Sequence, residues 1–210
     1  DGHVVVPAEL EPRFVRARER FLREAATLAR FGHPNIVRIF ATLEERGTAY
    51  LVLERLDGRT LGAELRSRGG PFTEAEGLDV AAQAAAALAA VHRVGVLHRD
   101  VTPSNLVRTS DGRLVLIDFG LARRFVADHT TSMTRIATPG YAPPEQHAGS
   151  ARFSARADGY ALGATVYRVL SDRHPPPADR RGRRDLTALW RVNPTVSRRT
   201  SDAVAAALSV

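Results

Sequence analysis

The chain has 210 residues, 44% of them hydrophobic, and its 30 basic and 23 acidic residues give a formal net charge of +7. This length fits one large domain or two small lobes around a cleft, and the hydrophobic content excludes wholesale disorder. The chain has no cysteine, which excludes disulfides and thiolate metal sites and is compatible with a reducing cytoplasm. No apolar run reaches the roughly 20 residues that a membrane helix needs.

All thirty basic residues are arginine. A basic balance can indicate an anionic partner such as nucleic acid or a membrane surface. Acidic residues, however, are interleaved with the arginines along most of the chain, and no aromatic residues alternate with them. We therefore expect solvated arginine-rich faces and no nucleic-acid partner.

Short apolar runs and one helical pattern fill the first 56 residues. The predicted elements are a strand at residues 4–6, a helix over 16–31, and strands at 37–43 and 49–54. Pro7 ends the first strand because proline cannot donate to a ladder. Phe21, Ala25 and Leu28 form the apolar stripe of the helix, and a turn around Arg46 and Gly47 joins the last two strands.

Helical patterns dominate the rest of the chain. The predicted elements are helices over residues 61–66, 73–94 and 155–170, a last helix from Ser197 or Thr200, and a hairpin of strands 106–108 and 114–117. A capping box at Thr73 and Glu76 opens the alanine-rich helix, and Ser154 is the expected cap of the helix over 155–170. The apolar face of the alanine-rich helix is predicted at Leu78, Ala82, Ala85, Leu88 and Ala89.

The most informative stretch runs from His98 to Gly120. It reads His98-Arg99-Asp100, continues to Asn105, and after an apolar hairpin reaches Asp118-Phe119-Gly120. Phosphoryl transfer needs metal ions held against the phosphates and a carboxylate near the attacking hydroxyl. Asp100 is a candidate for that carboxylate, whereas Asn105 and Asp118 carry the hard oxygen ligands that Mg²⁺ prefers.

Further motifs stand in a fixed order around this stretch. They are His33-Pro34-Asn35-Ile36-Val37, the segment Ala137-Thr138-Pro139-Gly140-Tyr141-Ala142-Pro143-Pro144-Glu145, and Asp158-Gly159-Tyr160-Ala161-Leu162-Gly163. With them the chain resembles a bacterial, eukaryotic-like Ser/Thr protein kinase catalytic domain over residues 4–210. The segment 137–145 resembles the end of an activation segment, which small-molecule kinases generally lack.

The resemblance implies an α+β, two-lobe kinase fold, with a small, incomplete β-rich lobe at residues 1–56 and a larger, mainly helical lobe at 57–210. It also implies ATP and Mg²⁺ as cofactors and a protein substrate with a Ser or Thr acceptor, self-phosphorylation included. We expect a cytoplasmic domain without a membrane segment, in a protein that other regions could anchor to a membrane.

The resemblance also assigns roles residue by residue. Asp100, Asn105 and Asp118 would be catalytic, and the last two would bind Mg²⁺. The nucleotide would contact Leu53, Glu54 and Leu56 at the adenine edge and Val107 beneath the ring, while Glu24 would pair with a phosphate-binding lysine.

Four residues would be regulatory, namely Arg99, Phe119, Thr134 and Thr138. Arg99 would bind a phosphate on the activation segment through its guanidinium. Thr134 is the candidate phosphosite by its place before Thr138, with Thr130, Thr131 and Ser132 as alternatives. Phe119 would pack against His98, Leu28 and Ile39, which would link the metal site to the helix over residues 16–31.

Three departures separate the chain from the family pattern. No glycine-rich loop precedes residue 4, Pro7 stands where the family has its lysine, and Thr102 replaces a second lysine. The chain contains no lysine at all, and Arg13 or Arg16 would be the substitute cation. We expect a catalytic domain truncated at both ends, with a pseudokinase or scaffold module as the alternative.

Overall fold

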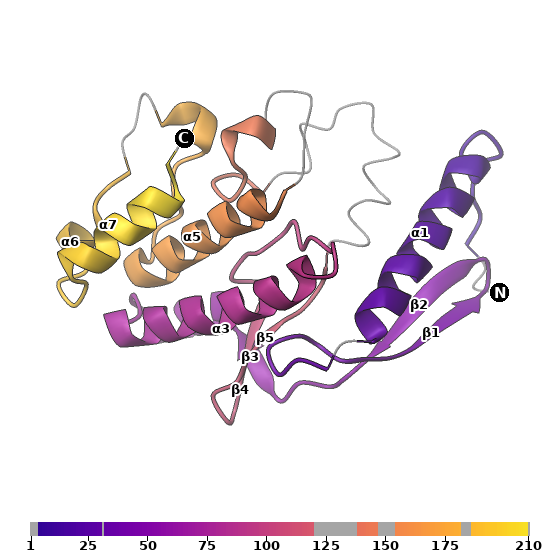
Figure 1. Ribbon diagram of the computed structural model, residues 1–210, viewed down its shortest axis with the longest axis horizontal. Coiled ribbons are helices and arrows are strands. Elements are labelled where there is room, and N and C mark those ends of the chain that lie inside the picture. Colours follow the sequence, from indigo (N-terminus) through magenta and orange to yellow (C-terminus); the bar gives the residue numbers. More distant parts are fainter. Residues whose placement is uncertain (1–3, 31, 120–137, 147–153, 182–185, 210) are drawn as a thin grey trace.

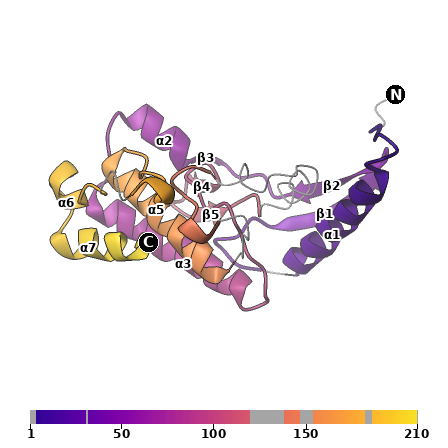
Figure 2. The same cartoon turned by 90° about the horizontal axis from the view of Figure 1, so that it is seen from above.

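The computed structural model describes residues 4–30, 32–119, 138–146, 154–181 and 186–209. Its elements fall into two groups (Figure 1). Helix α1 (Glu11–Ala29) and strands β1 (Ile39–Glu45) and β2 (Thr48–Leu53) lie at one end, and all later elements lie at the other. Figure 2 shows the same separation from above. The observed α+β organisation therefore matches the expected one.

The small group is a helix packed on a hairpin. β1 and β2 pair antiparallel from Ile39 opposite Leu53 to Glu45 opposite Thr48. Arg46 and Gly47, which form the turn, both have positive φ angles, of 53° and 77°. Two-residue hairpin loops favour such angles because their twist matches that of the strands. Both predicted strands and their turn are confirmed.

Two sequence predictions for this group need correction. Helix α1 begins at Glu11, five residues earlier than predicted, with Pro12 in its first turn, where a missing N–H costs no hydrogen bond. The strand predicted at residues 4–6 is wrong, because the structure has no strand there. The Val4 N–H donates to the Arg46 carbonyl over 3.0 Å, and Val5 is exposed.

The large group is built on two helices that pack against each other, α3 (Glu74–His92) and α5 (Ala155–Ser171). The capping box of α3 is confirmed, since Thr73 accepts from the Glu76 N–H and the Glu76 carboxylate accepts from the Thr73 N–H. Of the predicted apolar face of α3, Leu88 is buried, whereas Leu78 is 49% exposed and Ala82, Ala85 and Ala89 are also exposed. The predicted face is therefore wrong except at Leu88, which the helix buries together with Gly77, Val80, Ala84, Ala87, Ala90 and Val91.

A three-stranded antiparallel sheet completes this group, in the order β3 (Gly58–Thr60), β4 (Leu106–Thr109) and β5 (Leu114–Leu116). The β4–β5 hairpin is confirmed, whereas the sequence did not predict β3. The remaining elements are helices α2 (Leu61–Arg68), α6 (Leu189–Val192) and α7 (Arg198–Ala207), and the short 3₁₀ helices η2 (Pro144–Gln146) and η3 (Ala178–Arg180). None of the helices in the described ranges is long and apolar enough to cross a membrane.

Two further helix predictions concern caps. Ser197 caps α7 by accepting from the Thr200 N–H, so of the two predicted starts of this helix, Ser197 and Thr200, the first is confirmed. Ser154 lies at the N-cap of α5, but its side chain makes no capping hydrogen bond.

The two groups meet where residues 35–37 lie beside β5. Ile36 and Leu116 form a parallel bridge. The Val37 N–H donates to the Leu116 carbonyl over 3.0 Å, and the Leu116 N–H donates to the Asn35 carbonyl over 2.9 Å. β5 leads directly to Asp118, so this junction positions the candidate site.

Candidate active site

A buried carboxylate on α5 holds the start of the loop between α3 and β4. Asp158 is 1% exposed. It accepts hydrogen bonds from the backbone N–H groups of His98 (2.9 Å) and Arg99 (2.7 Å), and it contacts His92 Nε2 at 2.7 Å. Arg99 has a positive φ of 70°, which non-glycine residues adopt only where the surroundings enforce it. The loop conformation is therefore fixed from α3 and α5 together.

The side chains of Asp100 and Asn105 face each other across this loop. Asn105 Nδ2 donates to the Asp100 carboxylate over 2.7 Å and to its backbone carbonyl over 2.8 Å. The other carboxylate oxygen accepts from the Thr138 hydroxyl over 3.0 Å. Both Asp100 and Asn105 are buried. Residues 38 positions apart in sequence thus converge on one carboxylate.

His98 connects the loop to the segment after β5. Its Nδ1 accepts from the Asp100 N–H (3.3 Å), so in the neutral ring Nε2 carries the proton and donates to the Ile117 carbonyl (3.0 Å). Complete burial lowers the pKa of His98, although the nearby Asp158 carboxylate opposes this shift. The ring therefore stays neutral near pH 7.

Phe119 packs against the His98 ring, with centroids 4.8 Å apart and planes 56° to each other. Leu28, Ile39 and Phe119 belong to one buried cluster. The predicted packing of Phe119 onto His98 is present, and helix α1 shares its core with the residue after Asp118.

Asp118 is exposed, and its φ of 57° is also in the left-handed region. The preceding residue, Ile117, donates its N–H to the Asn105 carbonyl over 2.9 Å. The backbones that carry Asn105 and Asp118 are therefore directly linked. This link joins the residue before Asp118 to the loop between α3 and β4 (residues 93–105, hereafter the catalytic loop), in which Asp100 contacts Asn105 and also Thr138.

The comparisons with known proteins agree with this geometry. The family described as "Protein kinase domain" matches residues 8–205. The chain belongs to the protein kinase family. Together with the bacterial relatives described next, this match confirms the expected resemblance to bacterial Ser/Thr protein kinases and the protein Ser/Thr kinase class by family resemblance.

Several bacterial relatives are similar in sequence. The chain is 39% identical over 166 residues to a probable serine/threonine-protein kinase PknB of Corynebacterium glutamicum, which covers 75% of this chain and 25% of that protein. It is 38% identical over 168 residues to the serine/threonine-protein kinase PknB of Mycobacterium tuberculosis, with 76% and 26% covered. The chain spans about a quarter of the length of these two relatives.

Solved structures share the fold. The apo form of PpkA-294 superposes with a TM-score of 0.79 at 27% identity, covering 98% of this chain and 73% of that one. Rad53 (residues 1–466) in complex with AMP-PNP superposes with a TM-score of 0.76 at 24% identity, covering 93% and 51%. The kinase fold expected from the sequence is therefore the observed one.

The residues expected at the adenine edge of this kinase domain lie at the end of β2. Leu53 is 41% exposed, and Leu56 is half-buried. The Glu54 N–H donates to the Arg38 carbonyl (2.9 Å), and its carboxylate pairs with Arg113 Nη2 at 3.3 Å. The backbone carbonyl of Glu54 is the group that these contacts leave for a ligand.

The other two expected nucleotide residues lie on separate elements. Val107 is buried in β4, opposite Thr60 and Val115. Glu24 is half-buried on α1, beside the buried Ala25. Hydrogen bonds join Asp100 to Asn105 and to Thr138, whereas Val107 and Glu24 lie on other elements, β4 and α1.

The donor set suits Mg²⁺ in its chemistry. Both amide hydrogens of Asn105 are used by Asp100, so its amide oxygen is the group left to face a cation. Asp118 adds an exposed carboxylate. No group of three or more His, Cys, Asp or Glu side chains that could hold a metal occurs among the described residues. Two protein oxygens fit Mg²⁺, which usually keeps waters and takes substrate phosphates as further ligands.

Some predicted regulatory residues cannot be placed. Thr134 and its alternatives Thr130, Thr131 and Ser132 lie outside the described residues. Sequence reasoning, for its part, gave no role to Gln83 or His92, which the structure places in polar networks. For Gln83 the available signal was one amide inside an alanine-rich helix.

Proposed function

We propose that this kinase domain transfers the γ-phosphoryl group of ATP to Ser or Thr hydroxyls of proteins. The observation that carries the proposal is the convergence on the Asp100 carboxylate, which accepts from Asn105 at 2.7 Å and from the Thr138 hydroxyl at 3.0 Å. A substrate protein with a Ser or Thr acceptor is the implied partner, and a second copy of the domain could serve as one.

Asp100 would orient the substrate hydroxyl and accept its proton. The Asp100 carboxylate is oriented by the hydrogen bonds that it accepts from Asn105 and from the Thr138 hydroxyl. Geometry decides such a role first, before any shifted pKa.

Asn105 and Asp118 would hold Mg²⁺ at the junction of the loop and β5. An ion held by these two residues would supply positive charge against the charge that develops on the transferred phosphoryl group. The hydrogen bonds from Asn105 Nδ2 to Asp100 orient the amide so that its oxygen is the available ligand. The backbone link from Ile117 to Asn105 keeps the two ligand-bearing segments adjacent.

The remaining residues would bind the nucleotide and regulate the domain. Leu53, Glu54 and Leu56 would contact the adenine edge, and Val107 would lie beneath it. Residues 1–56 would then form the small lobe and 57–210 the large one. We propose Arg99 as the group that binds phosphorylated Thr134, since a guanidinium binds phosphate through two parallel hydrogen bonds.

A phosphotransfer assay tests this function. The intact chain is incubated with [γ-³²P]ATP, Mg²⁺ and casein, beside the variant Asp100→Asn. We expect slow transfer by the intact chain because it has no lysine to bind the phosphates. In the variant we expect the transfer rate to fall by at least about 100-fold, the size of a general-base contribution. Equal transfer by both proteins would contradict the proposal.

A pseudokinase or scaffold is the second candidate, and one observation favours it. The chain has no lysine, and Pro7 lies in a segment without strand structure. Mg²⁺-dependent ATP binding without any phosphate transfer to casein or to the chain itself would select this alternative. Transfer that depends on Asp100 would exclude it.

A further inference from the structure

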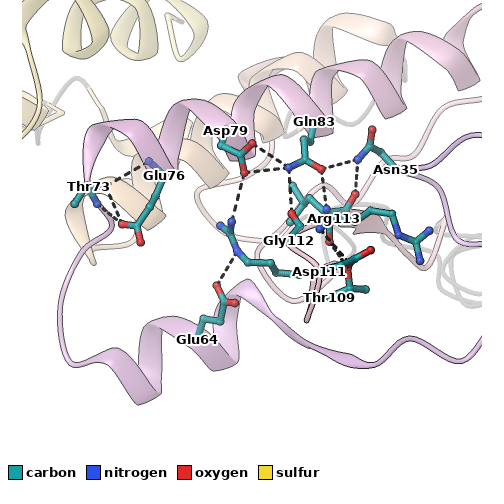
Figure 3. Close-up of polar contacts among 12 residues, drawn as sticks. Asn35, Glu64, Thr73, Glu76, Asp79, Gln83, Thr109, Asp111, Gly112 and Arg113 are labelled. Carbon is teal, nitrogen blue, oxygen red and sulfur yellow. Dashed lines mark hydrogen bonds and ion pairs between the residues drawn. The ribbon is translucent and has the colours of Figure 1, made fainter.

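Gln83 lies on α3, outside the site described above, and contacts three parts of the molecule. Its Oε1 accepts from Asn35 Nδ2 and from the Leu114 N–H, both over 2.8 Å. Its Nε2 donates to the two carboxylate oxygens of Asp79, each at 3.0 Å, and lies 3.4 Å from the Gly112 carbonyl. Figure 3 shows the side chain reaching from α3 towards the β4–β5 hairpin and Asn35.

The contacts of Gln83 define the orientation of its amide. Asp79 as a carboxylate can only accept, and the Leu114 N–H can only donate. Nε2 must therefore face Asp79 on the helix, and Oε1 must face the start of β5. The side chain is a directed bridge from helix α3 to strand β5.

Asn35 extends this bridge to the loop after α1. Its Nδ2 donates to Gln83 Oε1 and, over 2.7 Å, to the Leu114 carbonyl. Its backbone carbonyl accepts from the Leu116 N–H, and the next contact along the chain is the Val37 N–H to the Leu116 carbonyl. The loop is thus fastened to β5 at both ends of that strand, and Asn35 is buried.

The far end of β5 is fastened to the catalytic loop. The Ile117 N–H donates to the Asn105 carbonyl, and the Ile117 carbonyl accepts from His98 Nε2. Asp118 follows directly. Its backbone position is therefore set by two groups of contacts, one from residues 35–37 and one from the catalytic loop, and the first group is anchored on α3 through Gln83.

We propose that Gln83 is a positioning residue for the Mg²⁺·ATP site, which acts by locking residues 35–37 and β5 together ahead of Asp118. This inference rests on the proposed function for its consequence in nucleotide binding. The claim that Gln83 holds residues 35–37 against β5 does not rest on that function, because amide hydrogen exchange can test it without any ligand.

The test compares variants of the intact chain by amide hydrogen exchange and by Mg²⁺·ATP titration calorimetry. Gln83→Ala removes every contact of the amide but keeps a strong helix former in α3. We expect exchange at Val37 and Leu116 to rise about tenfold and the Kd for Mg²⁺·ATP to rise about tenfold, as for other supporting contacts of a metal site.

A donor–acceptor swap separates positioning from general destabilisation. Gln83→Glu alone keeps the acceptor for Asn35 and Leu114 but faces the Asp79 carboxylate. Adding Asp79→Asn restores a donor–acceptor pair on the helix, and all contacts of the side chain at position 83 except the longest, to Gly112, can re-form. The 3.4 Å ion pair of Asp79 with Arg108 is lost in both variants that carry Asp79→Asn. We expect the double variant to recover most of the exchange protection and affinity that Gln83→Glu loses, and Asp79→Asn alone to change little.

Glu76→Gln is the matched control on the same helix, since it weakens the capping box of α3 and the ion pair from Glu76 to Arg68 of α2 without touching residues 35–37 or β5. If Gln83→Ala changes exchange and affinity no more than this control does, or the double variant recovers nothing, the inference is overturned. If the unmodified chain binds no Mg²⁺·ATP, the proposed function fails, and the exchange data alone decide whether Gln83 locks the loop.

Discussion

The two sheets of the molecule differ sharply in how they are covered. β1 buries only Ile39 of its seven residues and β2 buries none of its six, whereas three of the four residues of β4 and all three of β5 are buried. Phe40 and Leu43 are at least half exposed on β1. The residues proposed for catalysis flank strands β4 and β5 of the covered sheet, and those proposed for the adenine edge lie at the end of β2 in the open one.

Because of this contrast, many buried contacts hold the proposed catalytic residues in place, and few hold the residues proposed for the adenine edge. The catalytic loop is held by a buried carboxylate, a buried histidine and backbone links to β5. The hairpin of β1 and β2 has α1 on it and few buried side chains. Regions with few buried contacts open at lower free energy, so the hairpin of β1 and β2 should be the less stable part.

The largest expected effect is a loss of stability in the covered region, which consists of β4, β5 and the catalytic loop. Asp158→Asn replaces one carboxylate oxygen by an NH2 group, which faces the N–H of either His98 or Arg99 and leaves that buried donor unsatisfied, at a cost of about 1–3 kcal/mol. We expect the free energy of unfolding, from urea titration followed by circular dichroism, to fall by about 3 kcal/mol. Asp202→Asn, at an exposed position on α7, is the control and should stay within about 0.5 kcal/mol. A loss below 1 kcal/mol for Asp158→Asn, about the net worth of one hydrogen bond, would show that this carboxylate does not hold the loop.

The next effect concerns the packing of α3 against α5. A Cβ at Gly77 would lie 2.4 Å from Leu170 Cδ2, whereas a Cβ at Gly159 would meet nothing within 4 Å. Gly77→Ala should lower stability by about 1–3 kcal/mol through overpacking, and Gly159→Ala should raise it by up to about 1 kcal/mol through helix propensity. Thermal unfolding of the two variants checks the pair, and equal melting temperatures would contradict the close packing.

A pH effect should arise from the covered region as well. Burial lowers the pKa of His98, so the unfolded chain binds the proton more readily than the folded one. The contribution of neutral His98 to the free energy of unfolding is therefore fully present above the unfolded pKa of about 6.5. It is lost as the pH falls below that value towards the folded pKa. Urea titrations from pH 8 to pH 5 measure this slope.

Two variants test which histidine causes this pH dependence of stability. The pKa of His174 is also lowered, first by burial and then by Arg168, so His174 adds a slope of the same sign. His98→Asn and His174→Asn should each reduce the dependence, and His98→Asn should reduce it more because His98 is fully buried. An unchanged slope in His98→Asn would contradict a neutral buried ring.

The smallest effect is expected on the open sheet. Leu43 and Tyr50 are opposite each other, and both are exposed. Leu43→Thr should cost no more than about 0.5 kcal/mol, within the range of a cross-strand pair. A loss above about 1.5 kcal/mol, outside that range, would mean that this face is covered in the protein and that the contrast between the sheets is false.

The sequence predicted the elements that carry their own local signals. The capping box at Thr73 and Glu76 predicted the start of α3, and the turn at Arg46 and Gly47 predicted the first hairpin. The motif order also predicted which side chains meet, since Asp100 and Asn105 are in contact and Phe119 packs on His98.

Other features depend on contacts that no local pattern encodes. The β-branched run at residues 4–6 has no partner strand in the described structure, whereas the polar β3 exists because it pairs with β4. The buried face of α3 was misassigned because alanines surround the helix, and packing against α5 decides which of them are covered. Gln83 was missed because its partners, Asn35 and Leu114, are 48 and 31 residues away.

The most direct test of the account is the Mg²⁺ dependence of ATP binding to the intact chain. Titration calorimetry with ATP, with and without Mg²⁺, is compared between the unmodified chain and Asp118→Asn. Asparagine also tolerates the left-handed backbone at this position, so the variant removes the charge and leaves the loop intact. The account predicts Mg²⁺-dependent binding that weakens at least about tenfold in Asp118→Asn. Binding that is equally tight without Mg²⁺, or equally tight in the variant, would contradict the assignment of Asn105 and Asp118 as the metal ligands.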